Sequence, residues 1–152
     1  MLKNEKRKVG YADIVGDLLH WGHIEFLRRC RNTCDYLVVG VEPDETMRAN
    51  KRETIFSYEK RVEMIKELRC VDEVRRNLSW DATGTMEQLV SEGYNLKFWF
   101  HGDDNEYPRA TEFIESIGGE AIITPYIKGI NTTQIIETIL ERYGVRNHCG
   151  GG

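Results

Sequence analysis

Apolar positions along the chain fall into short runs separated by longer segments of mixed polarity. The run at 35–41, DYLVVGV, is apolar almost throughout, which is typical of a strand covered on both faces of a sheet. The other runs are shorter or more mixed, and the one at 71–76 is the weakest. The pattern predicts five strands, at 8–14, 35–41, 71–76, 96–102 and 120–125.

Between these strands lie segments with the length, composition and end signals of helices. Ser57 and Asn131 stand where an N-cap is expected, and Gly144 stands where a helix would end. Thr85 and Gln88 have the spacing of a capping box. The sequence thus predicts helices over 23–32, 57–68, 86–93, 106–119 and 132–144.

Strands that alternate with helices predict a parallel sheet with helices on both faces. Right-handed crossovers then give a single Rossmann-like, doubly wound α/β domain with its core at about 8–143 and frayed ends at 1–7 and 145–152. Such sheets bind ligands at the carboxyl ends of their strands. We therefore expect functional residues just after positions 14, 41, 101 and 125.

Length, composition and charge narrow the class of protein. A chain of 152 residues with 40% hydrophobic and 30% charged residues suits one globular domain. The net charge of -4 argues against a general nucleic-acid binder. No apolar run approaches a membrane span and no signal peptide is apparent, so we expect a cytoplasmic protein. The four cysteines lack zinc-site spacing and are interpreted as reduced thiols: Cys30, Cys34, Cys70 and Cys149.

The segment after the first strand carries the most specific pattern. His20 and His23 lie three apart at a strand-to-helix turn, so both imidazoles can point to one side. The helix start adds unpaired N–H groups, and Gly22 lets a phosphate approach the backbone. This HxGH segment predicts a phosphate site with two imidazole donors, although two unrelated histidines near a helix start would look the same.

Three further segments follow strand ends. Residues 128–133, KGINTT, form a glycine turn that opens onto a helix and offers hydroxyl donors, or simply a capped helix. Residues 101–104, HGDD, can hold a base, a ribose or a metal ion, or form a plain polar turn. The charged loop at 44–52 can neutralise phosphates or be solvated.

These motifs together resemble the HxGH cytidylyltransferases that act on glycerol 3-phosphate, phosphoethanolamine and phosphocholine. The resemblance runs through DLLHWGH, DYLVVGV, SYEKR, VDEV, HGDD and GINTT in the family's order, over roughly residues 9–140. It implies a homodimer that joins CMP from CTP to a small phosphorylated alcohol. Mg²⁺ would accompany CTP through its phosphates, with no metal ligand expected from the protein.

The resemblance also assigns residues to roles. It implies catalytic roles for His20, His23 and Lys51. Acceptor binding falls to Asp17, Arg52, Arg61 and Arg69. Nucleotide binding falls to Ile14, Val15, Asp17, Gly22, His101, Gly102, Asp103, Lys128, Gly129, Ile130, Thr132 and Thr133.

The sequence departs from the family near the last helix. Tyr126 stands at the family's phosphate-binding arginine, Asn131 stands at its serine, and Lys128 is the nearest cation. The segment PYIKGI is more similar to cytidylyltransferase domains of phosphonate biosynthesis, so a phosphonate acceptor is an alternative. An ATP-using enzyme of the same class and a non-catalytic nucleotide-binding protein are further alternatives.

Overall fold

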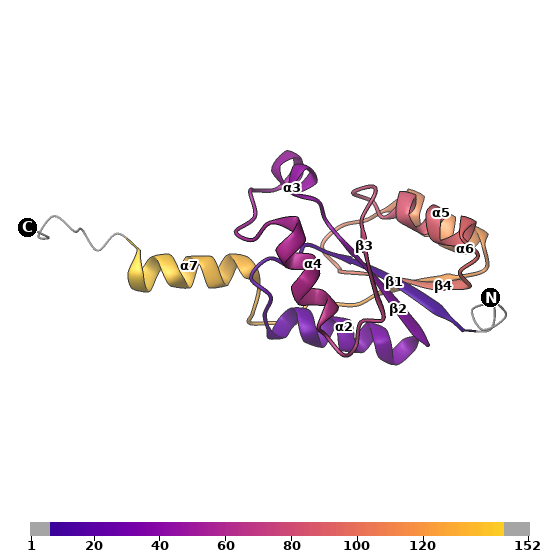
Figure 1. The fold of residues 1–152 in the computed structure, drawn as a ribbon, viewed down its shortest axis with the longest axis horizontal. Helices are drawn as coiled ribbons and strands as arrows, with labels where there is room; N and C mark the ends of the chain where they lie inside the picture. The colour runs from indigo at the N-terminus through magenta and orange to yellow at the C-terminus, as the bar shows by residue number, and fades with distance from the viewer. Residues whose placement is uncertain (1–6, 145–152) are drawn as a thin grey trace, which may run out of the picture.

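The computed structural model describes residues 7–144, which are built around one five-stranded sheet (Figure 1). Every neighbouring pair of strands is parallel, and their order is β3-β2-β1-β4-β5. This confirms the predicted Rossmann-like doubly wound fold. The predicted frayed ends lie outside the described residues, apart from Arg7. The strands are β1 (Val9–Ile14), β2 (Tyr36–Val41), β3 (Glu73–Arg76), β4 (Leu96–His101) and β5 (Glu120–Ile123).

Helices cover both faces of the sheet. On one face α2 and α4 bury residues such as Leu27 and Ile65 against Phe100. On the other face α5 and α6 bury Leu89 and Ile114 beside Trp99. The helices are α2 (Trp21–Thr33), α3 (Asp44–Asn50), α4 (Tyr58–Lys66), α5 (Thr83–Ser91), α6 (Pro108–Ser116) and α7 (Thr132–Tyr143).

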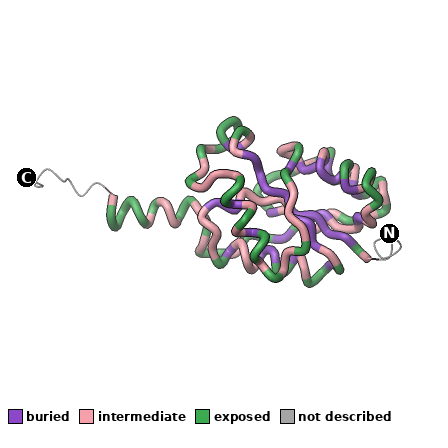
Figure 2. Tube along the Cα trace, viewed as in Figure 1, coloured by how far each residue is buried: buried purple, intermediate pink, exposed green. Residues whose placement is uncertain are grey.

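The last helix differs from the others. Asn131 caps α7 as predicted, by accepting a hydrogen bond from the backbone N–H of Gln134, and Gly144 ends it. None of its residues is buried, and it extends away from the body of the domain (Figures 1 and 2). Among the described residues, no helix has the length and apolar character needed to cross a membrane.

Two predictions of local structure are wrong. The segment after β2 is not a loop, because Asp44–Asn50 forms the short helix α3 with Met47 as its buried anchor. The proposed capping box is absent as well: α5 begins at Thr83, and Thr85 lies inside it. The Thr85 hydroxyl is buried, donates to Asn77 Oδ1 at 2.9 Å and accepts from the N–H of Leu78.

The cysteines within the described residues are free thiols, as predicted. Cys30 and Cys34 are buried and Cys70 is half-buried, and burial raises the pKa of each thiol. The fourth, Cys149, lies outside the described residues. The described cysteines therefore belong to the packing of the domain.

Sheet topology fixes where a ligand can bind. The chain passes from β1 to β2 on one side, while β4 pairs with the other edge of β1. A crevice is expected at such a reversal of strand order, beyond the carboxyl ends of the strands. The turns after β1 and β4 meet there, and each carries a motif identified in the sequence.

Candidate active site

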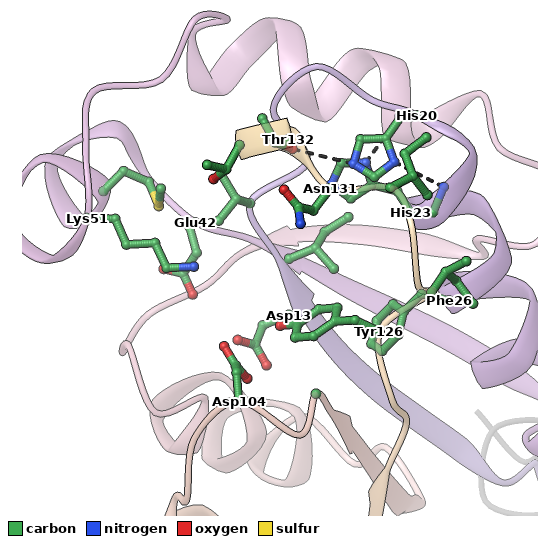
Figure 3. A pocket seen from close by; sticks show the side chains of 18 of the residues that line it. Asp13, His20, His23, Phe26, Glu42, Lys51, Asp104, Tyr126, Asn131 and Thr132 are labelled. Atoms are coloured by element: carbon green, nitrogen blue, oxygen red, sulfur yellow. Dashed lines mark hydrogen bonds between the residues drawn. The ribbon is translucent and has the colours of Figure 1, made fainter. Parts of the chain in front are cut away.

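Two histidines hold the turn between β1 and α2. His20 is the N-cap of α2, and its Nδ1 accepts a hydrogen bond of 3.0 Å from the backbone N–H of Gly22. Nδ1 of His23 accepts in turn from the backbone N–H of His20 at 3.1 Å. The pair satisfies N–H groups that a helix start leaves without partners. Both rings are thereby fixed at the amino end of α2 (Figure 3).

These contacts determine which ring nitrogen carries the proton. Because both Nδ1 atoms accept N–H groups, each neutral ring is protonated on Nε2. Burial lowers the pKa of both histidines, that of His23 to about 4. The hydroxyl of Thr132 donates to the carbonyl of Asp17, so its oxygen can accept from Nε2–H of His20 at 3.5 Å. The site therefore contains two neutral imidazoles that act as donors.

Gly22 is needed for a reason that the sequence did not reveal. A Cβ at this position would lie 2.8 Å from Cε1 of His20 and 3.2 Å from Cγ2 of Ile130. Contacts below 3.0 Å force neighbouring atoms to shift. The glycine thus makes room for the His20 ring, in addition to any access that it gives to a phosphate.

Asp17 ties the turn to the loop before α4. Its carboxylate accepts from Arg52 Nη1 at 3.0 Å and from the backbone N–H groups of Ile55 and Phe56 at 2.9 Å. Burial alone would raise the pKa of Asp17, but these backbone and guanidinium donors outweigh it and lower the pKa. Asp17 is 1% exposed and does not line the cavity described below. Its carboxylate positions the loop that carries Arg52.

Arg61 lies inside the protein and does not line the cavity described below. Its side chain is fully buried and donates to the carbonyls of Phe56 and Val15 and to Asp44 Oδ1, at 3.0, 2.6 and 2.7 Å. All three guanidinium nitrogens are thus engaged by protein atoms. The structure does not bring Arg61 to the cavity where the sequence analysis expected an acceptor contact.

The turns enclose a cavity of about 480 Å³, a size typical of small-ligand sites. Residues from the ends of β1, β2 and β4 and from the starts of α2 and α7 form its walls. Eleven of the predicted site residues lie along it: Ile14, Val15, His20, Gly22, His23, Lys51, Arg52, Gly102, Ile130, Thr132 and Thr133.

The other predicted residues do not line this cavity. Lys128 and Gly129 form an exposed turn, and Arg69 is exposed just beyond α4. His101 stacks on Trp99 with ring centroids 4.4 Å apart and borders a smaller adjacent pocket. The remaining residues outside it are Asp17, Arg61 and Asp103.

Tyr126, which stands at the family's arginine position, forms part of the cavity wall. Its ring stacks on Phe26 with centroids 6.4 Å apart. A Cβ on Gly102 would lie 2.5 Å from the Tyr126 ring, so the glycine of the HGDD segment admits the aromatic side chain. An aromatic surface therefore lines the cavity where the resemblance implied a cation.

Sequence reasoning pointed to the HGDD segment, which contains Asp104, but missed the rest of the acidic part of the cavity. Asp13, Glu42 and Asp104 all line it, together with the aromatic rings of Trp80 and Tyr107. Burial and then the charge of Asp104 raise the pKa of Asp13 to about 6. Burial and then the charge of Asp13 raise the pKa of Glu42 to about 8. Burial is the main cause of both pKa shifts, and repulsion from a neighbouring carboxylate adds to each of them.

Among the described residues, no set of three or more His, Cys, Asp or Glu side chains is arranged to hold a metal ion. The three carboxylates line the cavity without converging as a ligand set. The imidazoles of His20 and His23 and the hydroxyl-bearing residues Thr132 and Thr133 line the cavity, and N–H and O–H donors of this kind suit phosphate oxygens. A phosphate-bearing ligand fits these donors.

The sheet, the crevice and the paired Nε2–H donors at a helix start define a nucleotide-binding domain of the HxGH class. Residues 16–138 match the model of the cytidylyltransferase-like family. The chain belongs to this family and is a nucleotidyltransferase.

Relatives within the family differ in their reactions. Glycerol-3-phosphate cytidylyltransferase of Bacillus subtilis is 34% identical over 81% of this chain and 90% of its own. Ethanolamine-phosphate cytidylyltransferase of Arabidopsis thaliana is 34% identical over 68% of this chain, which spans only 25% of that protein. FAD synthase of Thermococcus onnurineus is 35% identical over 94% of this chain and 99% of its own length. The crystal structure of the lipopolysaccharide core biosynthesis protein of Thermoplasma volcanium aligns with this structure with a TM-score of 0.64. The two chains are 26% identical, over 82% of this chain and 99% of the other.

Proposed function

We propose that this protein transfers CMP from CTP to a small phosphorylated alcohol of the glycerol 3-phosphate or phosphoethanolamine type and releases pyrophosphate. The paired Nε2–H donors of His20 and His23 in the cavity carry the proposal. The hydroxyls of Thr132 and Thr133 line the same cavity from α7. The choice of CTP rests on the two cytidylyltransferase relatives.

The reaction needs no covalent enzyme intermediate. A phosphate oxygen of the acceptor forms a bond to the α-phosphorus of CTP, while the bond to the bridging oxygen of pyrophosphate breaks. Charge develops on the α-phosphate and on the leaving oxygens, where neutral imidazole donors stabilise it without a change in their own protonation. His20 and His23 would act in this way, as preorganised donors.

Lys51 supplies positive charge. It lines the cavity, and within the described part of the chain its ammonium makes no ion pair. Arg52, in contrast, is already paired with Asp17. Lys51 would therefore neutralise the triphosphate directly, whereas Arg52 would contribute from a fixed position.

Magnesium would reach the site on the nucleotide. The donor set of the cavity suits phosphates better than a bare cation, because its carboxylates do not converge. When bound to the triphosphate, Mg²⁺ would neutralise part of its charge. The protein's own task is to orient the phosphates with His20, His23 and Thr132.

We also propose that the protein works as a homodimer and that α7 packs on a second copy. The helix α7 projects from the domain (Figure 2). Its residues Ile139, Leu140 and Tyr143 are 49%, 59% and 70% exposed. Apolar residues grouped on one exposed helix need a covering surface. Because α7 also begins at the cavity wall, its docking would steady the residues around Thr132.

A nucleotide panel tests the proposed reaction. The protein is incubated with Mg²⁺, CTP or ATP, and in turn glycerol 3-phosphate, phosphoethanolamine, phosphocholine and 2-hydroxyethylphosphonate, while pyrophosphate is measured. Release with CTP and one phosphorylated alcohol supports the proposal, and release only with the phosphonate moves the protein to that alternative. Turnover with ATP alone would assign it to the ATP-using branch that the FAD synthase relative illustrates. Tight CTP binding without product would indicate a non-catalytic protein.

A further inference from the structure

Glu42 has a carboxylate oxygen with no protein partner at the edge of the cavity. The residue follows β2 directly and is only 3% exposed, yet it lines the cavity. Its Oε1 accepts a hydrogen bond from Asn77, while Oε2 is buried without any hydrogen bond. A buried polar atom without a partner costs free energy, so a ligand that supplies a donor is favoured here.

A buried network holds this carboxylate in place. Asn77 donates to Glu42 and accepts, through its own Oδ1, from the hydroxyls of Tyr11 and Thr85 at 2.6 and 2.9 Å. Gly40 makes room for Tyr11, because a Cβ there would overlap its hydroxyl. The orientation of Glu42 is thus set before any ligand binds.

Charge in this part of the cavity is unbalanced. Figure 3 shows the carboxylates of Asp13, Glu42 and Asp104 on the side away from the two histidines. Lys51 is the cavity-lining cation among the described residues that has no ion pair, and its Nζ lies 5.9 Å from the centroid of the Trp80 ring. Three carboxyl groups thus face one unpaired ammonium in this part of the cavity, and burial, followed by the charge of Asp13, raises the pKa of Glu42.

We propose that Glu42 binds the primary ammonium group of the acceptor, with Asp13 and Asp104 adding negative charge to the same cavity, so that the preferred substrate is a small phosphorylated or phosphonylated amine. This inference rests on the proposed function and names its acceptor class. An ammonium supplies the N–H donor that Oε2 lacks and balances the carboxylates. A quaternary ammonium has no N–H and would leave Oε2 without a partner.

Matched acceptors that differ only in one group give the test. Initial rates are measured with Mg²⁺ and CTP for phosphoethanolamine and for ethylene glycol monophosphate, and likewise for 2-aminoethylphosphonate and 2-hydroxyethylphosphonate. A charge-assisted hydrogen bond predicts that kcat/KM for the amine exceeds that for the alcohol by about tenfold or more. Phosphocholine should fall below phosphoethanolamine.

The variant Glu42→Gln should reduce the amine preference by about tenfold and leave the KM for CTP within about twofold. Glutamine keeps the oxygen that Asn77 contacts, so the network survives. Glu45→Gln is the matched control, because Glu45 lies three residues on and pairs with Arg76 at the surface. If Glu42→Gln does not fold, Asp104→Asn serves instead, since Asp104 is exposed and outside the buried network.

The possible results are distinct. An amine preference that falls in Glu42→Gln but not in Glu45→Gln supports the inference. Equal or better use of the alcohols by the wild-type protein overturns it while the proposed reaction stands. A raised KM for CTP with an unchanged preference also overturns it, because Glu42 would then contact the nucleotide. Absence of pyrophosphate with every acceptor and either nucleotide overturns the proposed function and this inference together.

Discussion

The Nδ1 atom of His23 accepts a 3.1 Å hydrogen bond from the backbone N–H of His20, and this contact couples the two imidazoles of the HxGH segment. With Nδ1 of His20 engaged by Gly22, each ring has Nε2–H as its one N–H donor, and that of His20 lies 3.5 Å from the Thr132 hydroxyl. The helix start therefore orients the donors, and no side chain outside the turn is needed to fix their tautomer. The turn therefore holds two N–H donors in preset positions.

Loss of either histidine should slow the reaction without abolishing nucleotide binding. His20→Ala and His23→Ala are each expected to lower kcat by about 10²–10³, as for a lost oxyanion donor. Single-turnover rates and CTP calorimetry separate the chemical step from binding. Near-normal turnover in either variant would contradict the role given to that residue.

The ionisation of Glu42 should affect stability in a definite direction. Its pKa is raised from 4.5 to about 8, so the folded protein holds a proton there that the unfolded chain releases. The contribution of Glu42 to the free energy of unfolding is therefore fully present below about pH 4.5. It falls by roughly 2–5 kcal/mol as the pH rises to about 8. Glu42→Gln cannot ionise and should gain stability relative to the wild type over this range. Urea denaturation at pH 5 and pH 8.5 measures the difference, and a constant difference would show that the shift is absent.

Arg61 is expected to be structural. Replacing it with methionine leaves two carbonyls without their donors and removes the guanidinium from Asp44, which keeps the Thr54 hydroxyl and the Tyr58 N–H; this should cost about 3–5 kcal/mol of stability. Urea denaturation of Arg61→Met gives the value. Arg69→Met, at an exposed position, is the control and should change stability little. Normal stability of Arg61→Met with a selective rise in the acceptor KM would instead restore the acceptor role that the resemblance implied.

If the protein is a dimer through α7, a charge placed on this helix should halve the mass of the particle in solution. Leu140→Asp places a charge on the exposed apolar residues of α7 and should convert the protein to a monomer. Glu141→Gln, at the next exposed residue, should leave the dimer intact. Sedimentation equilibrium distinguishes the two states. A wild-type protein that sediments as a monomer at all concentrations would exclude the dimer.

The sequence predicted the fold well because its signals are local. The apolar run at 35–41 becomes the interior strand β2, between β3 and β1, and Ser57 and Asn131 cap the helices as predicted. The helix α3 was missed because only Met47 of its seven residues is buried, too few to give a periodic pattern. The capping box failed because Thr85 bonds to Asn77, a tertiary contact that outweighs the local pattern.

The candidate site was predicted less completely. The histidine pair and the threonines of α7 could be located because the carboxyl ends of strands were the place to search. Glu42 directly follows a predicted strand, so the same rule applied to it. The charged segment at 44–52 follows the same strand, and the site roles were assigned to that segment instead. Asp13 is a charged residue in a strand, and Trp80 and Tyr107 reach the cavity from distant segments. The burial of Arg61 could not be foreseen, because an arginine held by three internal acceptors looks the same in sequence as one that binds a phosphate.

The measurement that tests the central claim most directly is ³¹P NMR of the reaction with CTP, Mg²⁺ and phosphoethanolamine. The account predicts that the α-phosphorus of CTP moves into a new diphosphate diester while an equal amount of free pyrophosphate appears, and that both changes are about 10²–10³ slower in His23→Ala. Intact CTP after prolonged incubation with the full acceptor panel, or conversion of CTP to CMP without a diester, would contradict it.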